Sequence, residues 1–279
     1  MQTSFPPSQK HRLKTLLARL NFYGFPGLWW LRWQFFKIAL WLLDRQFVKS
    51  DVDQAQIFQI DIEQASFQIR RGTSDKFVID ETWRKKEYGG THKGTVVDLG
   101  ANIGAFTIYA AQNAERVIAV EASSENLQLL EKNVKLNKLD NVFIENACIS
   151  SRYGTSTLYF HTINNGMSST LYKGPSKHSE SVRNITFREL FEKYSITEIS
   201  FIKCDIEGGE FDVFSGENLE YLDRVKSICL EIHCNYVKPD EVIEFLTCMA
   251  DIGFHINVNN MSFLMLTGTG ILQLDRIAD

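Results

Sequence analysis

The chain has 279 residues, of which 44% are hydrophobic and 23% are charged, as is typical of a globular protein with one substantial core. Its formal net charge is -4 and its isoelectric point is near 5.9, so it lacks the basic excess of a nucleic-acid-binding protein. Five cysteines occur without a C-x-x-C pair, and the first residues do not lead into a signal peptide. The composition predicts a cytoplasmic protein without a disulfide framework or zinc site.

The N-terminal segment predicts two helices. Leucines at helical spacing in residues 13–20 form one apolar stripe, and an aromatic stretch follows at 28–45. Arg32, Gln34 and Lys37 interrupt that stretch, so it lacks the roughly 18 consecutive apolar residues of a membrane-spanning helix. Two interpretations stay open. The stretch could be a helical cap on the rest of the chain or on a second subunit, forming a homodimer, or a peripheral helix at a membrane surface.

Residues 56–90 predict a small β-structured continuation of this extension. IFQIDIEQASFQIR alternates apolar and polar residues in places, which favours two strands in a hairpin. The stretch RRGTSDKFVIDETWRKKEYGG that follows predicts a turn, a short strand and a helix. Because Gly89 and Gly90 end this region, we place a domain boundary there. The expected organisation is an extension over residues 1–90 and a second domain over residues 91–279.

The second domain begins with a nucleoside-binding pattern. TVVDLGANIGAFTIYAAQ, RVIAVEAS and SENLQLLEKNVKLN read as strand, glycine turn, helix, strand and helix, which is a βαβ unit of a parallel sheet. Gly100 and Gly104 bracket the turn after the strand at 95–99, where a side chain would keep a ligand from the backbone. Glu121 ends the second strand, where a carboxylate can accept hydrogen bonds from both ribose hydroxyls.

The turn reads D-x-G-x-N-x-G from Asp98 through Asn102 to Gly104, and not G-x-G-x-x-G. A dinucleotide pyrophosphate needs several backbone N–H groups at a helix N-terminus. S-adenosylmethionine has no phosphate and carries a cationic sulfonium and an amino-acid tail, whose ammonium Asp98 is placed to bind. The pattern favours S-adenosylmethionine, with an NAD site or a turn without any cofactor as alternatives.

A second cluster of polar residues follows later in the chain. In ISFIKCDIEGGEFDVFSG an apolar strand ends at Asp205, and Glu207 and Glu210 lie in the turn into a helix. Strand ends of this kind border the ligand crevice of an open α/β sheet. Glu210 is interpreted as favourable charge at a helix N-terminus. The next strand, SICLEIHCN, ends near His233, which is either a core histidine or a catalytic group facing the crevice.

Together these stretches resemble the FkbM-type S-adenosylmethionine-dependent methyltransferases. The resemblance runs in order through RRGTSDKFVIDETWRKKEY, VVDLGANIGAFTIYAA, AVEASSENLQLLEKNVKLN, NNGMSSTL, FIKCDIEGGEFDVFSG and CLEIH, over about residues 70–233. It departs at Ala122, where the family often has proline. The resemblance implies a Rossmann-like class I methyltransferase fold, with a seven-stranded, mostly parallel sheet and helices on both faces.

The resemblance also implies O-methylation of a hydroxyl on a glycan, glycolipid or secondary metabolite. His233 is the expected general base, with Asp205 or Glu207 holding the hydroxyl or the imidazole. In a rival arrangement these three residues hold a divalent metal, although no metal is assigned. The adenine is expected beside the end of the third strand. The residues expected to contact S-adenosyl-L-methionine are Tyr88, Asp98, Gly100, Asn102, Gly104, Glu121, Asn146, Ala147 and Asp205.

The sequence disfavours three other functions. An NAD-dependent oxidoreductase is disfavoured because G-x-G-x-x-G is missing. A methyltransferase-like domain that binds the cofactor or a partner without catalysis is disfavoured because Asp98, Glu121, Asp205 and His233 are all present. Methylation of a nucleobase nitrogen is disfavoured because no [D/N]-P-P-[Y/F/W] motif follows the fourth strand. The polar segment at 161–179 is interpreted as a substrate lid or as a plain surface loop.

Overall fold

The computed structural model describes residues 56–160, 169–170, 178–234, 237–259 and 269–276. The chain divides into two compact units, 1–54 and 55–279, and all described residues belong to the second unit. The helices expected before residue 50, with the membrane-surface and homodimer interpretations, lie outside the described residues, as does most of the predicted lid. Among the described helices, none is long and apolar enough to cross a membrane.

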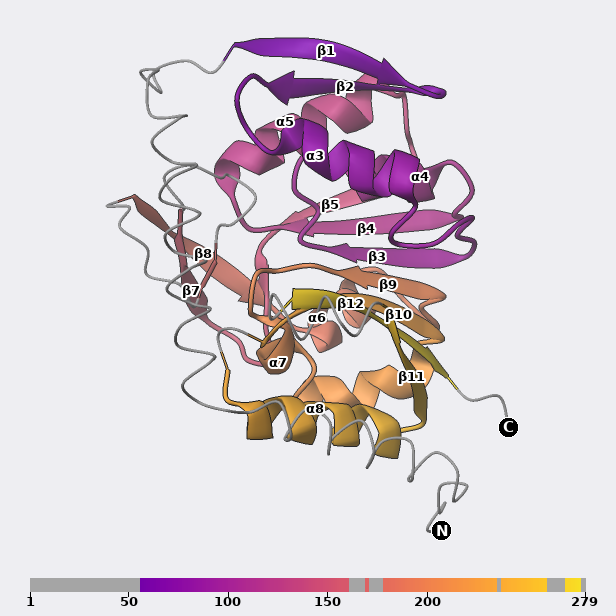
Figure 1. The fold of residues 1–279 in the computed structure, drawn as a ribbon, viewed down its shortest axis with the longest axis vertical. Coiled ribbons are helices and arrows are strands. Elements are labelled where there is room, and N and C mark those ends of the chain that lie inside the picture. The colour runs from indigo at the N-terminus through magenta and orange to yellow at the C-terminus, as the bar shows by residue number, and fades with distance from the viewer. Residues whose placement is uncertain (1–55, 161–168, 171–177, 235–236, 260–268, 277–279) are drawn as a thin grey trace. The chain divides into compact units, whose positions relative to one another are not determined.

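A seven-stranded sheet organises the second unit, in the order β11-β12-β10-β9-β3-β4-β5 (Figure 1). Neighbouring strands from β10 to β5 run parallel, whereas β12 is antiparallel to both of its neighbours. The chain reverses its direction of winding between β3 and β9, which is where ligands bind in such sheets. This confirms the predicted class I methyltransferase fold. The strands are β3 (Thr95–Leu99), β4 (Arg116–Glu121), β5 (Val142–Asn146), β9 (Phe201–Cys204), β10 (Ser227–His233), β11 (Phe254–Asn259) and β12 (Thr269–Arg276).

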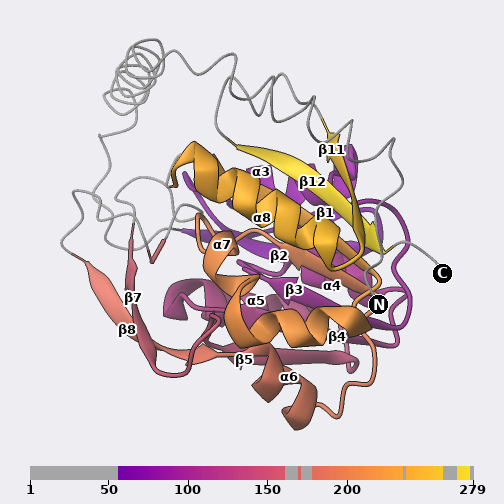
Figure 2. The same cartoon turned by 90° about the horizontal axis from the view of Figure 1, so that it is seen from below.

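Helices cover both faces of the sheet, so its central strands are apolar on both sides. Alternate residues of β3 show this: Val96 packs in one cluster with residues of α4, and Val97 and Leu99 pack in another with residues of α6. Figure 2 shows α8 over the edge of the sheet where β12 and β11 lie, on the side of the second cluster. The helices of the parallel sheet are α4 (Ala105–Ala111), α5 (Ser124–Leu136), α6 (Phe187–Lys193), α7 (Glu210–Val213), a 3₁₀ helix (Gly216–Arg224) and α8 (Pro239–Asp251).

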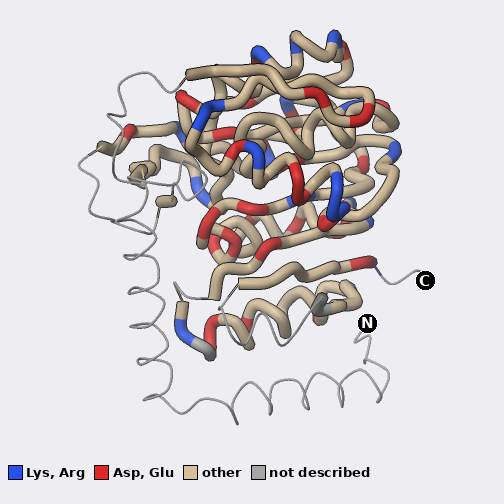
Figure 3. Tube along the Cα trace, turned by 45° about the horizontal axis from the view of Figure 1, so that its top comes forward, with Lys and Arg blue, Asp and Glu red and all other residues tan. Residues whose placement is uncertain are grey.

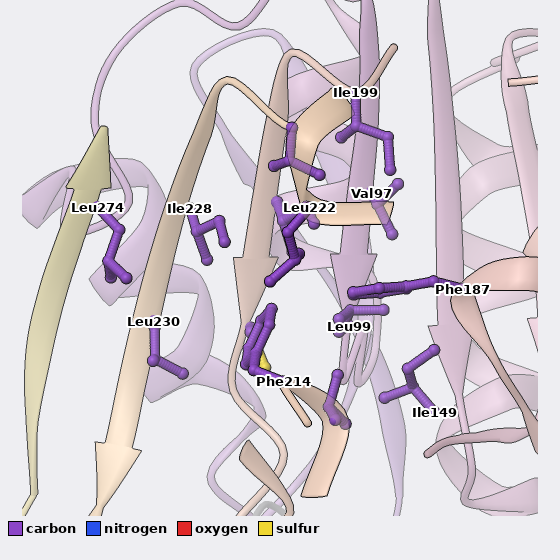
Figure 4. Close-up of a cluster of buried hydrophobic side chains, with 14 of the residues drawn as sticks. Val97, Leu99, Ile149, Phe187, Ile199, Phe214, Leu222, Ile228, Leu230 and Leu274 are labelled. Carbon is purple, nitrogen blue, oxygen red and sulfur yellow. The ribbon is translucent and has the colours of Figure 1, made fainter. Parts of the chain in front are cut away.

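The larger of these clusters fills the space between β3, β9, β10 and the helices after β8 (Figure 4). Leu99, Ile228 and Leu230 come from the strands, Phe214 directly follows α7, and Leu222 lies in the 3₁₀ helix. Each is at most 2% exposed, and fully burying one such side chain stabilises the fold by roughly 1.5–3 kcal/mol. This packing fixes where β9 and β10 end, and therefore where the polar residues beyond them lie.

The N-terminal part of this unit forms the predicted hairpin, with β1 (Ile57–Ile62) antiparallel to β2 (Ala65–Arg70). The short strand expected after it is wrong, because α3 (Asp75–Asp80) runs directly into a π-helical turn (Glu81–Lys85). Ile79 and Trp83 lie four residues apart and are fully buried, as one face of a helix requires. They pack against residues of α4, a contact that the local sequence does not reveal.

The hairpin is joined to the methyltransferase sheet through α5. Side chains of Asn133 and Asn137 bind both the N–H and the C=O groups of Gln68 and Ser66 in β2. The compact unit accordingly begins at Ala55, whereas the sequence placed the domain boundary at residue 90. A separate three-stranded sheet, in the order β6-β8-β7, follows β5. Its strands are β6 (Cys148–Ile149), β7 (Thr155–Tyr159) and β8 (Ser179–Ile185).

We predict that His92 makes the fold sensitive to acid. Its ring lies 4.2 Å from that of Phe201 and 5.2 Å from that of Phe106, and burial lowers the pKa of His92 to about 4. The unfolded chain, with a histidine pKa near 6.5, binds more protons between these two values, so stability is lost as pH falls through that window. At about pH 5 the loss is roughly 2 kcal/mol.

Urea unfolding at about pH 7.5 and about pH 5 measures this effect. The variant His92→Phe should lose that part of the acid destabilisation, which the parent protein should show in full. An unchanged pH dependence in His92→Phe would contradict the prediction.

Candidate functional site

Two turns meet at the carboxyl ends of β3 and β9. Gly100 has φ of +76°, and a Cβ added there would lie 1.9 Å from the backbone oxygen of Asp205. Gly104, with φ of +92°, would place a Cβ 2.8 Å from Leu130 of α5. Both conformations favour glycine, and neither position has room for a side chain. The two glycines singled out from the sequence therefore allow the glycine turn to pack against its neighbours.

Glu121 faces this turn from the end of β4 and is 6% exposed. The backbone N–H of Asn102, which has φ of +52°, donates to Oε2 at 2.7 Å, and that of Ser123 donates to Oε1 at 2.8 Å. Burial raises the pKa of Glu121, although these hydrogen bonds oppose it. The predicted acidic residue and the predicted turn thus lie in direct contact.

These groups line one cavity, whose empty space with its open mouth is about 680 Å³. Its wall combines apolar side chains with a few polar groups. The lining residues are Gly100, Asn102, Val120, Glu121, Ala122, Asn126, Ala147, Cys148, Ile149, Leu158, Thr170, Asp205, Ile206, Glu207 and Gly209.

The residues expected beside the adenine have different positions. Ala147 is buried and lines the cavity. Asn146 is exposed, and its amide donates to the backbone oxygens of Glu121 at 3.0 Å and Ala122 at 3.3 Å. Asn146 therefore supports the cavity wall at Glu121 and Ala122 without lining the cavity. Asn126, which the sequence did not single out, lines the cavity and donates to Glu121 Oε1 at 3.5 Å.

Asp98 is fully buried and is not part of the cavity wall. Thr107 donates to its Oδ2 at 2.6 Å, and the ammonium of Lys203 lies 3.4 Å from its Oδ1. The sequence paired Asp98 with a ligand ammonium, but in this structure its cationic partner is the protein's own lysine. Asp98 therefore links β3 to α4 through Thr107 and to β9 through Lys203.

Lys203 is a site residue that the sequence did not single out, although it precedes Cys204 in the motif KCDIEGGE. Its ammonium donates to the backbone oxygen of Gly100 at 2.7 Å and lies 5.5 Å from the ring of Tyr88. Burial by itself would lower the pKa of Lys203, but the charges of Asp98 and Asp205 raise it. Lys203 therefore stays charged and fixes the glycine turn. The sequence did not indicate this role because it depends on a contact between β9 and β3, which forms only in the folded sheet.

Tyr88 is 5% exposed, and its hydroxyl donates to Oδ2 of Asp205 at 3.4 Å. Burial and the charge of Asp205 raise the pKa of Tyr88 well above its ordinary value, so the phenol keeps its proton. Among the described residues, Tyr88 is not part of the cavity wall. It reaches the site through Asp205, which does line it.

The three residues predicted to be catalytic converge at one side of the cavity. One ligand atom each from Asp205, Glu207 and His233 can be chosen so that all lie within 4.8 Å of one another. The two ring nitrogens of His233 each face a carboxylate: Nδ1 lies 2.9 Å from Glu210 and Nε2 lies 3.4 Å from Glu207. Glu231 approaches Nε2 to 3.9 Å.

The neighbouring carboxyl groups change the pKa of His233. Burial by itself would lower the pKa of His233, but the hydrogen bond with Glu210 and the charges of Glu210, Glu207 and Asp205 raise it to about 10. Burial raises the pKa of Glu207 and that of Glu231 to about 8. A raised pKa favours the protonated imidazole, which cannot accept a further proton, so the role of His233 as general base stays a prediction.

Glu210 has a larger part than the helix-end charge expected for it. It is fully buried, its Oε1 accepts from the N–H of Gly208 at 3.0 Å, and the same oxygen faces His233. Its Oε2 has no hydrogen-bond partner within the described part of the chain. Glu210 therefore orients the imidazole.

The sheet order and the glycine turn beside an acidic strand end define the chain as a class I methyltransferase. Over residues 98–256 it also matches the sequence model of the Methyltransferase FkbM domain. That match covers more than half of the 279 residues. The chain therefore belongs to the FkbM methyltransferase family, and S-adenosylmethionine is its cofactor.

Two curated proteins are similar to parts of the chain. Methyltransferase 1 of Beauveria bassiana is 25% identical over 158 residues, which are 49% of this chain and 64% of that protein. The tRNA (guanine(37)-N(1))-methyltransferase Trm5b of Methanocaldococcus jannaschii is 43% identical over 49 residues, which are 18% of this chain and 14% of that protein. The chain thus spans less than two thirds of either relative.

Two solved structures are similar to the chain at low sequence identity. The FkbM methyltransferase of Methylobacillus flagellatus is 14% identical with a TM-score of 0.45, over 71% of this chain and 47% of that one. An rRNA methylase of Streptococcus thermophilus is 13% identical with a TM-score of 0.44, over 74% of this chain and 95% of that one.

We predict that Lys203→Met strongly destabilises the protein, because it leaves the carboxylate of Asp98 buried without a counter-charge. Breaking a buried pair on one side costs about 3–5 kcal/mol of the free energy of unfolding. The double variant Asp98→Asn/Lys203→Met should lose less than the sum of the two single variants. Urea unfolding followed by circular dichroism measures all three.

A matched control is Lys226→Met, which removes the exposed ion pair with Glu198. That change should cost less than about 1 kcal/mol. Equal losses in Lys203→Met and Lys226→Met would show that the buried pair does not hold the turn.

Proposed function

We propose that this chain is an O-methyltransferase that transfers the methyl group of S-adenosylmethionine to a hydroxyl of a glycan, glycolipid or secondary metabolite. The observation that carries the proposal is the position of the cluster formed by Asp205, Glu207 and His233. Asp205 and Glu207 line the same cavity as the nucleoside-binding features Gly100 and Glu121. Groups able to bind and deprotonate a hydroxyl thus lie next to the expected donor.

In this proposal the nucleoside lies between the glycine turn and Ala147. Glu121 accepts hydrogen bonds from the two ribose hydroxyls, in place of one or both backbone N–H groups that it binds in this structure. Gly100 lines the cavity, Gly104 lets the turn pack against α5, and Ala147 packs against the adenine. Asp205, with Tyr88 behind it, faces the amino-acid tail. Asn102 shapes the turn through its left-handed backbone.

The reaction requires little of the protein beyond alignment and removal of a proton. The acceptor oxygen forms a bond to the methyl carbon while the carbon–sulfur bond breaks, and sulfur keeps the electron pair as a neutral thioether. The hydroxyl proton passes to a carboxylate of the cluster. Because both nitrogens of His233 face carboxylates, we infer that the imidazolium orients Glu207 and does not itself take that proton. Holding donor and acceptor in line can supply about 7–11 kcal/mol of the barrier.

A hydroxylated acceptor fits the charges of the described residues better than a nucleic acid does. Figure 3 shows lysine and arginine residues scattered among aspartate and glutamate residues along the described trace. The cavity wall beside the donor carries carboxylates, which repel phosphates and suit hydroxyl groups. Transfer to tRNA, the substrate named for the Methanocaldococcus jannaschii relative, is the arm of the test that would contradict the proposal.

The acceptor class can be tested with S-adenosylmethionine labelled in its methyl group. Oligosaccharides, glycolipids, hydroxylated macrocycles and a tRNA transcript are each incubated with the enzyme, and the product is examined by nuclear magnetic resonance. We expect a methoxy carbon on one of the first three. A label on a nitrogen or carbon atom would overturn O-methylation, and a label on the tRNA would overturn the proposed acceptor class. Cofactor binding without any transfer would favour the non-catalytic alternative.

We predict that Glu121→Ala weakens binding of S-adenosylhomocysteine about ten- to a hundredfold. Each hydrogen bond to a charged group is worth about 1.5–3 kcal/mol, and a tenfold change corresponds to about 1.4 kcal/mol. Isothermal titration calorimetry measures the affinity, and a thermal melt of the free protein shows whether the variant is folded. The control Glu131→Ala removes an exposed carboxylate of the following helix and should bind as the parent does. Equal affinity of Glu121→Ala would exclude its ribose contact.

A further inference from the structure

We propose that Asp205, Glu207 and His233 form a binding site for a divalent first-row metal ion at the wall of the cofactor cavity. The ion binding depends only on the geometry of these residues. Its role toward an acceptor hydroxyl rests on the proposed function. The site combines one imidazole nitrogen with carboxylate oxygens from two other residues, and each residue comes from a strand end or the turn that follows it.

The geometry of the three side chains suits one ion. Ligand atoms at about 2.1 Å from an octahedral ion lie about 3 Å apart when adjacent and about 4.2 Å apart when opposite. Here the three ligand atoms lie within 4.8 Å of one another, and His233 Nε2 lies 3.4 Å from Glu207 Oε2. Small side-chain rotations would bring all three to one ion without movement of the strands.

Nδ1 of His233, the ring nitrogen that would not bind the ion, has the kind of partner that is usual for metal-binding histidines. A ligating histidine almost always gives its other ring N–H to a carboxylate, carbonyl or water, which fixes the ring and strengthens the ligand. Nδ1 of His233 lies 2.9 Å from Oε1 of Glu210, which is fully buried and is itself held by the N–H of Gly208. Nε2 is thereby directed toward Asp205 and Glu207, where the ion would replace its proton.

Charge gives an independent argument. Four carboxylates, those of Asp205, Glu207, Glu210 and Glu231, surround a single imidazole. His233 and Glu210 are at most 5% exposed, and Oε2 of Glu210 has no hydrogen-bond partner in the described ranges. Buried carboxyl groups this close together all ionise only where a cation compensates their charge. A divalent ion supplies one charge more than the proton it displaces, at the point where the carboxylates converge.

The ligand set indicates the class of ion. Carboxylate oxygens suit Mg²⁺, Ca²⁺ and Mn²⁺, whereas imidazole suits the transition ions of zinc, copper, iron and nickel. A mixed set with one nitrogen therefore favours a transition ion such as Mn²⁺. Because the protein supplies three residues, further coordination positions remain for water or for the hydroxyl oxygen of an acceptor. An acceptor bound in this way would lie beside Asp205 and Glu207, which line the cavity.

Titration of the full-length, chelator-treated protein with Mn²⁺, followed by electron paramagnetic resonance, tests this site. We expect one ion per chain and, in pulsed spectra, coupling to an imidazole nitrogen. His233→Ala should remove the nitrogen coupling, and Glu207→Gln should weaken binding at least tenfold. Glu210→Gln, which changes the partner of the histidine and leaves the three proposed ligands in place, should weaken it about ten- to a hundredfold. The matched control His255→Ala removes an exposed histidine and should bind as the parent does.

Absence of Mn²⁺ binding would overturn the proposal, as would nitrogen coupling that survives in His233→Ala. Each variant is also melted and titrated with S-adenosylhomocysteine, so that a variant that fails to fold is recognised and the nearly isosteric Glu207→Gln decides. Binding of S-adenosylhomocysteine without Mn²⁺ would refute the metal site and leave the proposed function standing. Binding of Mn²⁺ without S-adenosylhomocysteine would support the site and count against the proposed function.

Discussion

The glycine turn after β3 packs directly against the acidic turn after β9, and the ammonium of Lys203 in β9 binds the glycine turn. It binds the backbone oxygen of Gly100 and pairs with the buried carboxylate of Asp98. Gly100 permits the contact because a Cβ there would overlap the backbone of Asp205. The cavity wall depends on this contact, since one turn meets Glu121 and the other carries Asp205 and Glu207.

Buried charged groups beside the cavity are costly, and the fold tolerates them because each has a hydrogen-bond or ion-pair partner. Asp98 has Thr107 and Lys203, and Glu121 has two backbone N–H groups. The cluster around His233 is less balanced, because several carboxylates share one imidazole. Functional sites commonly retain such imbalance where a ligand supplies the missing charge. The carboxylates around His233 are therefore the groups on which both the proposed reaction and the proposed ion depend.

The hairpin at the start of the described unit shows how far local patterns can be trusted. Its strands were predicted because apolar and polar residues alternate in them, which needs no distant partner. The segment after Arg70 was partly misjudged, since FVID has β-branched residues that favour a strand locally. Ile79 and Trp83 form a helical face only because α4 offers a surface for them. For the same reason, residues 55–90 belong to the methyltransferase unit.

The sequence by itself determined the strands at 95–99 and 201–204, the two glycines of the turn and the family, because these follow from runs of neighbouring residues. It also identified Asp205, Glu207 and His233 as a group, since carboxyl ends of parallel strands meet at one edge. Only the tertiary structure decided which charges pair. Lys203 meets Asp98 because β9 lies beside β3, and Glu210 meets His233 because α7 packs against β10. Such pairings depend on strand order and burial, which no local pattern specifies.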